Sequence, residues 1–137
     1  MSVIIIGIDL GTTNSLVSCM RNGVPEIFSN ELGQDLTPSV VAFAEDGALM
    51  VGQPAKDRIV THPHSGKACF KRDMGNKEPY LFDQKSLTPV ECSALILKEM
   101  KRIAELRLDQ PVSKAVISVP AYFRDSQRNA TLEAAAI

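Results

Sequence analysis

The stretch "GIDLGTTNS", from Gly7 to Ser15, is the most informative part of this sequence. It lies between two apolar runs, "VIII" before it and "LVSCM" after it, so it connects two predicted strands. A plain hairpin needs only two residues with unusual backbone angles, and Asn-Gly or Asp-Gly would suffice. This connection also carries an aspartate, two threonines and a further glycine. The extra polar groups indicate a function beyond turning the chain.

The residue types in this stretch suit a nucleotide phosphate accompanied by Mg²⁺. Glycine lets the backbone approach a phosphate closely, so that inward-pointing N–H groups can bind it. The hydroxyls of Thr12 and Thr13 add donors. Asp9 would repel a phosphate, but its carboxylate can hold the water shell that Mg²⁺ gives up reluctantly. The residues alone leave a second interpretation open, a polar turn between two core strands. The chain contains neither a P-loop motif nor a G-x-G-x-x-G dinucleotide motif.

Composition narrows the class of protein. A chain of 137 residues fits one modest domain or a large piece of a bigger protein. Hydrophobic residues make up 45% and charged residues 23%, which favours a globular domain over disorder. The net charge of −1 comes with no basic stripe, and no apolar run reaches the ~20 residues of a membrane span, so we expect neither nucleic acid nor membrane as a partner. Cys19, Cys69 and Cys92 are few and widely spaced, which predicts reduced thiols and a cytoplasmic location.

Local patterns predict a mixture of strands and helices. The apolar runs, with turn signals between them, predict an antiparallel meander of strands over residues 3–9, 16–21, 24–28, 39–44 and 49–51. Residues 54–60 fit a short helix, residues 67–75 have no clear period, and residues 76–86 are polar around the patch "YLF".

The strongest helix signal begins at "TPVE". Thr88 is the predicted N-cap, Pro89 the first helical residue and Glu91 the capping-box partner of a helix that reaches about Leu108. A strand over 115–119 follows and stops at Pro120, and Asp125 is the predicted cap of a last helix. That helix reaches "LEAAAI" without a stop signal, so we expect the chain to be the N-terminal portion of a longer protein.

Five separated blocks of the sequence resemble the seventy-kilodalton heat-shock (Hsp70, DnaK-type) chaperone family. They are "IGIDLGTTNS", "LTPSVVAF", "VGQPAK", "FKRDMG" and "VISVPAYFRDSQRNAT", in the family's order and over nearly the whole chain. The resemblance implies an actin-like ATPase (ribonuclease H-like) fold, an α/β fold with a mixed sheet and flanking helices. The chain would form most of the first of two lobes around a nucleotide cleft. Its core subdomain would take about residues 1–38 and 112–137, and a small upper subdomain about 39–111.

The resemblance also implies roles for particular residues. Residues Gly11, Thr12, Thr13 and Asn14 match the first phosphate-binding hairpin for ATP or ADP, and Asp9 matches the carboxylate that holds Mg²⁺ through water. Lys71, in "FKRDMG", matches the catalytic lysine and binds nucleotide as well, so the implied catalytic set is Lys71, Thr12 and Asp9. Phosphoryl transfer needs positioning and charge neutralisation, which these groups supply.

"VPAYF" resembles the segment that links nucleotide state to the peptide-binding domain. Pro120 and Arg128 match its relay proline and the arginine that reads it. In the full-length protein, ATP hydrolysis would drive binding and release of unfolded client peptides, together with a J-domain co-chaperone.

Two departures from the family pattern affect these expectations. Only residues 76–88 lie between the "FKRDMG" block and the capped helix, a shortening that favours the specialised HscC branch. The second lobe and the peptide-binding domain would lie beyond Ile137, so we expect the isolated chain neither to hydrolyse ATP nor to bind peptides. Surface that those domains normally cover favours self-association of the fragment.

Three other functions stay open at this point. A sugar or acetate kinase shares the actin-like fold and a D-x-G-T-like hairpin, although such kinases need no lysine and relay proline in this order. A filament-forming actin relative would assemble in the presence of ATP. A short chain that acts as a non-enzymatic regulatory module is the third.

Overall fold

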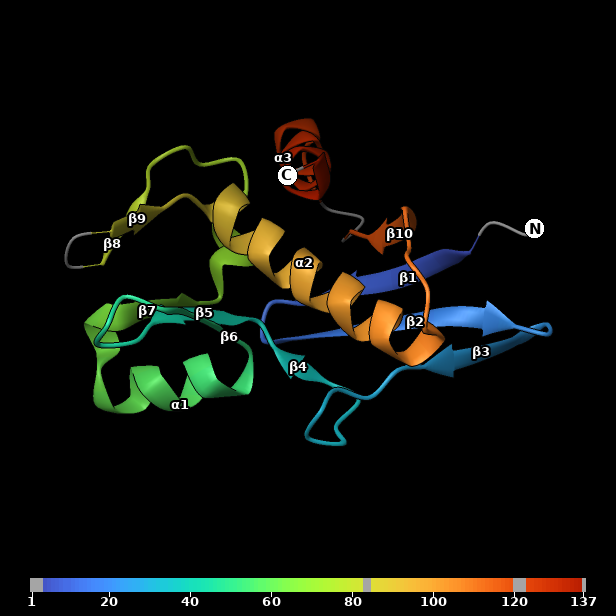
Figure 1. Cartoon of the computed structure of the whole chain (residues 1–137). Helices are drawn as coiled ribbons and strands as arrows, with labels where there is room; N and C mark the ends of the chain where they lie inside the picture. Colours follow the sequence, from blue (N-terminus) through green and yellow to red (C-terminus); the bar gives the residue numbers. More distant parts are fainter. Residues whose placement is uncertain (1–3, 83–84, 120–122, 137) are drawn as a thin grey trace.

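The protein is described by a computed structural model over residues 4–82, 85–119 and 123–136. Within these ranges the strands form three sheets, and helices pack against two of them (Figure 1). In the same residues no helix is both long enough and apolar enough to cross a bilayer.

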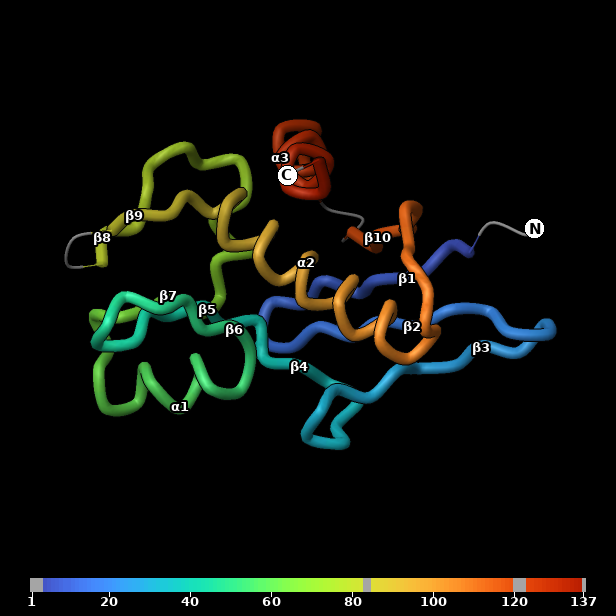
Figure 2. The backbone as a smooth tube through the Cα atoms, viewed as in Figure 1, coloured from blue at the N-terminus to red at the C-terminus, as the bar shows by residue number. Residues whose placement is uncertain are grey.

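The first sheet contains the predicted hairpins and is mixed. β1 (Ile5–Leu10), β2 (Asn14–Arg21) and β3 (Val24–Ile27) are antiparallel neighbours, joined at the second turn by Asn22 and Gly23, both with positive φ. β10 (Lys114–Ser118) pairs with β1 in parallel, with Val116 opposite Gly7. Figure 2 shows these two strands side by side although they come from opposite ends of the sequence. β4 (Thr37–Pro38) pairs with the start of β2.

The prediction of one antiparallel meander is wrong beyond the third strand. β5 (Val40–Phe43) lies in a second sheet, between β6 (Leu49–Val51) and β7 (Gly66–Ala68). The chain leaves the first sheet at Pro38, which has no N–H to continue the ladder along β2. β7 approaches β5 so closely that a Cβ on Gly66 would lie 2.2 Å from the carbonyl oxygen of Val41. Glycine is therefore required at that crossing.

Short helices, turns and a separate hairpin lie around the second sheet. α1 (Gln53–Thr61), the predicted short helix, packs on this sheet and is followed by a 3₁₀ turn, η1 (Pro63–Ser65). The segment without a clear period contains β7 and a second 3₁₀ turn, η2 (Phe70–Asp73). The polar segment after it forms a hairpin of β8 (Tyr80–Phe82) and β9 (Lys85–Leu87). The rings of Phe43 and Phe82, with centroids 5.8 Å apart, hold this hairpin against the second sheet.

α2 (Pro89–Leu108) is the centre of the core. Its predicted capping box is present: Thr88 Oγ1 accepts the N–H of Glu91 at 3.1 Å, and Glu91 Oε1 accepts the N–H of Thr88 at 2.9 Å. Its apolar face packs on the inward residues of β1 and β2 and reaches the second sheet as well. The inward residues that make this contact are Ile6, Ile8, Leu10, Val17 and Cys19, with Ile96, Met100 and Ile103 from the helix. The opposite face of the first sheet leaves several apolar side chains exposed.

α3 (Asp125–Ala136) packs against α2. The prediction that Asp125 caps this helix is wrong, because Asp125 is its first helical residue. The helix start is closed instead by Gln127, whose Oε1 accepts the N–H of Arg124 at 2.9 Å. Pro120, the predicted stop of the preceding strand, lies outside the described residues.

Candidate functional site

The connection between β1 and β2 is a tight hairpin in which only glycine fits at position 11. A Cβ at this position would lie 2.0 Å from the carbonyl oxygen of Asn14. Thr13 is exposed at the tip, whereas Thr12 and Asn14 are partly buried. In the described part of the chain, the backbone N–H groups of Thr12 and Thr13 donate to no protein acceptor. These two donors are therefore available to a ligand.

Asp9 stands at the end of β1, immediately before the hairpin, and is exposed. The parallel pairing of β1 with β10 places Ser118 opposite it, and Ser118 Oγ donates to Asp9 Oδ1 at 3.1 Å. The sheet thus fixes one oxygen of the carboxylate. Within the described residues the other oxygen has no hydrogen-bond donor from the protein, so it can accept hydrogen bonds from water.

Lys71 reaches the hairpin from η2. Its ammonium group donates to the carbonyl oxygen of Leu10 and lies 5.8 Å from the ring centroid of Phe123. Burial lowers the pKa of Lys71, and the nearby negative charge of Asp9 acts in the opposite direction. A partly desolvated cation therefore lies at the base of the hairpin, beside an exposed carboxylate. Such a cation interacts with a phosphate more strongly than one in bulk water does.

Two serines that the sequence did not single out form hydrogen bonds with the backbone of the hairpin. Ser15 Oγ accepts the N–H of Gly11 at 3.3 Å, and Ser39 Oγ donates to the carbonyl oxygen of Gly11 at 2.9 Å. The two hydroxyls are 2.8 Å apart. The N–H of Ser39 also donates to the carbonyl oxygen of Thr13, at 2.9 Å. Nothing local to either residue indicates this role, because Ser15 and Ser39 are 24 positions apart in the sequence.

The structure thus brings together the candidate residues Asp9, Gly11 to Asn14, and Lys71. It gives no such support to the predicted relay. Arg128 is exposed on α3, and no described contact joins its side chain to the hairpin. Pro120 lies outside the described residues.

The donor set fits a phosphate with a hydrated magnesium ion. The hairpin offers free N–H groups and threonine hydroxyls, Lys71 offers a positive charge, and Asp9 offers a carboxylate. Among the described residues no group of three or more His, Cys, Asp or Glu could hold a metal ion. Of the candidate residues, Asp9 supplies the carboxylate that would hold the water shell of Mg²⁺.

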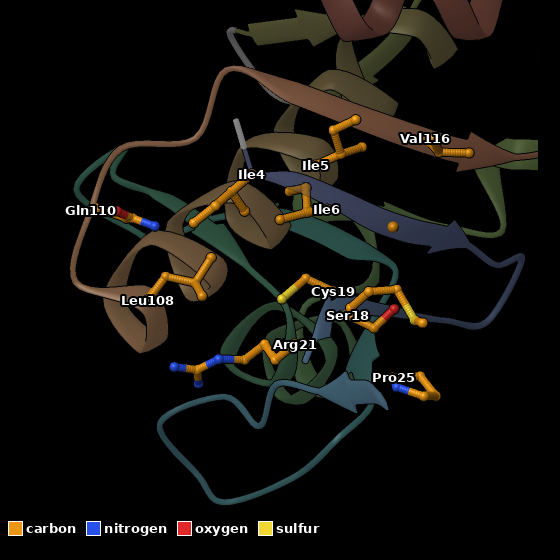
Figure 3. A pocket seen from close by; sticks show the side chains of 12 residues that line it. Ile4, Ile5, Ile6, Ser18, Cys19, Arg21, Pro25, Leu108, Gln110 and Val116 are labelled. Atoms are coloured by element: carbon orange, nitrogen blue, oxygen red, sulfur yellow. The ribbon is translucent and has the colours of Figure 1, made fainter. Parts of the chain in front are cut away.

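A separate pocket of about 700 Å³ lies at the opposite end of β1 and β2 (Figure 3). Ile5, Cys19 and Pro25 are among its lining residues, and Arg21 contributes the only charged side chain of that lining. The figure shows the Ile4 and Leu108 side chains on the same rim. This pocket is mainly apolar and lacks the phosphate-binding groups of the hairpin, so it is not the candidate site.

Comparisons with known proteins agree with the geometry. The family model described as Hsp70 protein matches residues 5–81 and 79–137. The chain is 46% identical over 134 residues to the chaperone protein DnaK of Thermotoga neapolitana; the match covers 97% of this chain and 22% of that protein. The chain therefore spans about a fifth of the length of this relative. The expected actin-like ATPase fold, with a mixed sheet and flanking helices, is confirmed, and the chain belongs to the Hsp70 family.

Proposed function

We propose that this chain supplies half of a binding cleft for magnesium-bound ATP or ADP. The observation that carries the proposal is the bond from Lys71 to the backbone of Leu10, because it places a partly desolvated cation from η2 against the hairpin and beside Asp9. Asp9 and Leu10 are neighbours in the sequence, whereas Lys71 lies 61 positions beyond Leu10. A solvated surface lysine would have no such contact.

Each residue has a distinct task in this proposal. The N–H groups and hydroxyls of Thr12 and Thr13 hold phosphate oxygens, and Asn14 closes the hairpin. Lys71 offsets negative charge on the phosphates and orients a water molecule for attack. Asp9 holds the water shell of the metal ion. Bound MgATP supplies the phosphoryl group and the divalent charge.

The whole protein's activity extends the proposal. Hydrolysis in the full-length protein would drive binding and release of unfolded peptides with a J-domain partner in the cytoplasm, and Pro120 and Arg128 would relay the nucleotide state. The division into subdomains at about residues 39 and 111 stays a prediction, because α2 packs on both sheets. Assignment to the HscC branch also stays a prediction. It rests on the short segment that forms β8 and β9.

Self-association of the chain is part of the proposal. The face of the first sheet opposite α2 leaves Ile5, Met20 and Val116 52%, 64% and 66% exposed. The accessible surface is 8345 Å², whereas a monomeric protein of 14.9 kDa averages about 7000 Å². The excess exceeds the ~800 Å² that each partner contributes to a stable interface. Light scattering should give more than the monomer mass; a monomeric mass would remove this part of the proposal.

The binding proposal is tested by titrating MgATP into the isotope-labelled chain and following backbone amides by NMR. We expect the amides of Thr12 and Thr13 to shift with a millimolar Kd, roughly −4 kcal/mol, because half a cleft makes few contacts. Lys71→Ala should weaken the Kd about tenfold, whereas Lys77→Ala, an exposed lysine further along the chain, should leave it unchanged. Unshifted hairpin amides would refute the proposal. ATP turnover by the isolated chain, lost in Lys71→Ala, would refute the half-cleft account.

A further inference from the structure

The two buried serines below the hairpin form a closed ring of hydrogen bonds with Gly11. A hydroxyl has one proton to donate. Ser39 donates its proton to the carbonyl oxygen of Gly11, so in the bond between the two hydroxyls Ser15 must be the donor. Ser15 in turn accepts the N–H of Gly11. The bonds therefore run in one direction, from the N–H of Gly11 through both hydroxyls and back to the carbonyl of Gly11.

The two hydroxyls are shielded from water, because each of the two serines is only 1% exposed. Both polar groups of the Gly11 backbone are used within it. The orientation of the peptide units on either side of Gly11 is therefore set by side chains. Removing either hydroxyl would leave a buried group without its partner, which costs more than the bond itself contributes.

The two serines come from different parts of the fold. Ser15 belongs to β2, and Ser39 lies between β4 and β5, where the chain passes from the first sheet to the second. The backbone of Ser39 also holds the carbonyl of Thr13. Ser39, where the chain crosses between the two sheets, is thus hydrogen-bonded to the carbonyl oxygens of both Gly11 and Thr13.

We propose that Ser15 and Ser39 are positioning residues for phosphate binding. We call this pair the serine clasp. It withdraws the N–H of Gly11 from any ligand and fixes the hairpin so that Thr12 and Thr13 present the donors. This inference rests on the proposed function, and it adds that the crossing segment at Ser39 sets the geometry of the phosphate site. Neither serine touches the ligand.

The test uses the whole chain with Ser15→Ala, Ser39→Ala and the double variant. The matched control is Ser93→Ala, which removes another buried hydroxyl. Ser93 lies on α2, and its Oγ donates to Met74 Sδ at 3.2 Å. Two measurements are made by NMR: hydrogen exchange of the Gly11 amide without ligand, and the Kd for magnesium tripolyphosphate from the shifts of the Thr12 and Thr13 amides.

Each single variant should speed exchange of the Gly11 amide about tenfold and weaken the tripolyphosphate Kd about five- to tenfold. The double variant should be little worse than either single variant, since a ring is opened by one break. The control should change neither quantity. The two single variants test the same ring, so one folded variant is sufficient. If neither folds, slowly exchanging hydroxyl protons of Ser15 and Ser39 in the unmodified chain are the expected signature.

The outcomes separate the two proposals. Unchanged Gly11 exchange in the variants, or the absence of protected hydroxyl signals in the unmodified chain, overturns the clasp. Faster exchange with an unchanged Kd makes the serines structural only and overturns their positioning role. If the unmodified chain binds neither tripolyphosphate nor MgATP at Thr12 and Thr13, the proposed function fails, and the positioning role fails with it.

Discussion

Gly11→Ala is the most direct perturbation of the hairpin, and its cost can be worked out from the structure. The new Cβ would be placed 2.0 Å from the carbonyl oxygen of Asn14, and real contacts of this kind are essentially never shorter than 3.0 Å. The carbonyl must therefore move by about 1 Å. Asn14 is the first residue of β2 and pairs with Pro38 of β4, so the movement disturbs the sheet and not a flexible side chain.

The expected destabilisation is about 2–3 kcal/mol, the upper part of the range for overpacked sites. For a chain of 137 residues, 1 kcal/mol corresponds to roughly 3–4 °C in the midpoint of thermal unfolding. The Tm should therefore fall by about 7–10 °C, measured by circular dichroism or calorimetry. The same variant should lose the MgATP-induced shifts at Thr12 and Thr13, because the serine clasp loses its geometry.

Gly7→Ala is the matched control, since it makes the same chemical change four positions earlier in β1. Its Cβ would meet Ser18 Oγ at 3.3 Å, and that side chain can rotate away. Alanine is favoured over glycine in a strand by about 0.5–1 kcal/mol, so the Tm should stay level or rise by a few degrees. The reasoning is refuted if Gly11→Ala stays within about 2 °C of the unmodified chain, or if both variants fall equally.

Three further predictions concern other parts of the molecule. Thr88→Ala removes the acceptor for the N–H of Glu91 and should lower stability by about 1 kcal/mol, measured by urea unfolding; an unchanged midpoint would show that the capping box does not stabilise α2. Burial raises the pKa of Cys92 to about 12, so at pH 8 only about one thiol in ten thousand is ionised, and iodoacetamide followed by mass spectrometry should label the less buried Cys69 first. Equal labelling rates would contradict this prediction. Asp9→Asn removes the charge that opposes desolvation and should lower the pKa of Lys71 further, as followed by NMR titration of its side chain; a raised or unchanged pKa would show that Asp9 does not act on this lysine.

The sequence determined those features whose causes lie within a few residues of one another. The capping box of α2 needs only Thr88 and Glu91, three positions apart, and the turn at Asn22 and Gly23 needs only those two residues. The hairpin at Gly11 is equally local. For Lys71 the residue pattern gave no local signal, and its candidate role came from resemblance to the family.

The distribution of the strands between sheets and the contacts of the hairpin depend on long-range packing. The apolar run within 39–44 predicts a strand, but it does not show whether the partner of that strand is β2 or β7. The parallel pairing of β1 with β10, and the bonds from Lys71 and Ser39 to the hairpin, join residues far apart in the chain. Burial of the apolar face of α2 against both sheets brings these distant segments together, and polar groups buried there need hydrogen-bond partners. The sequence therefore identifies the candidate residues of the site, whereas their close approach in space results from packing.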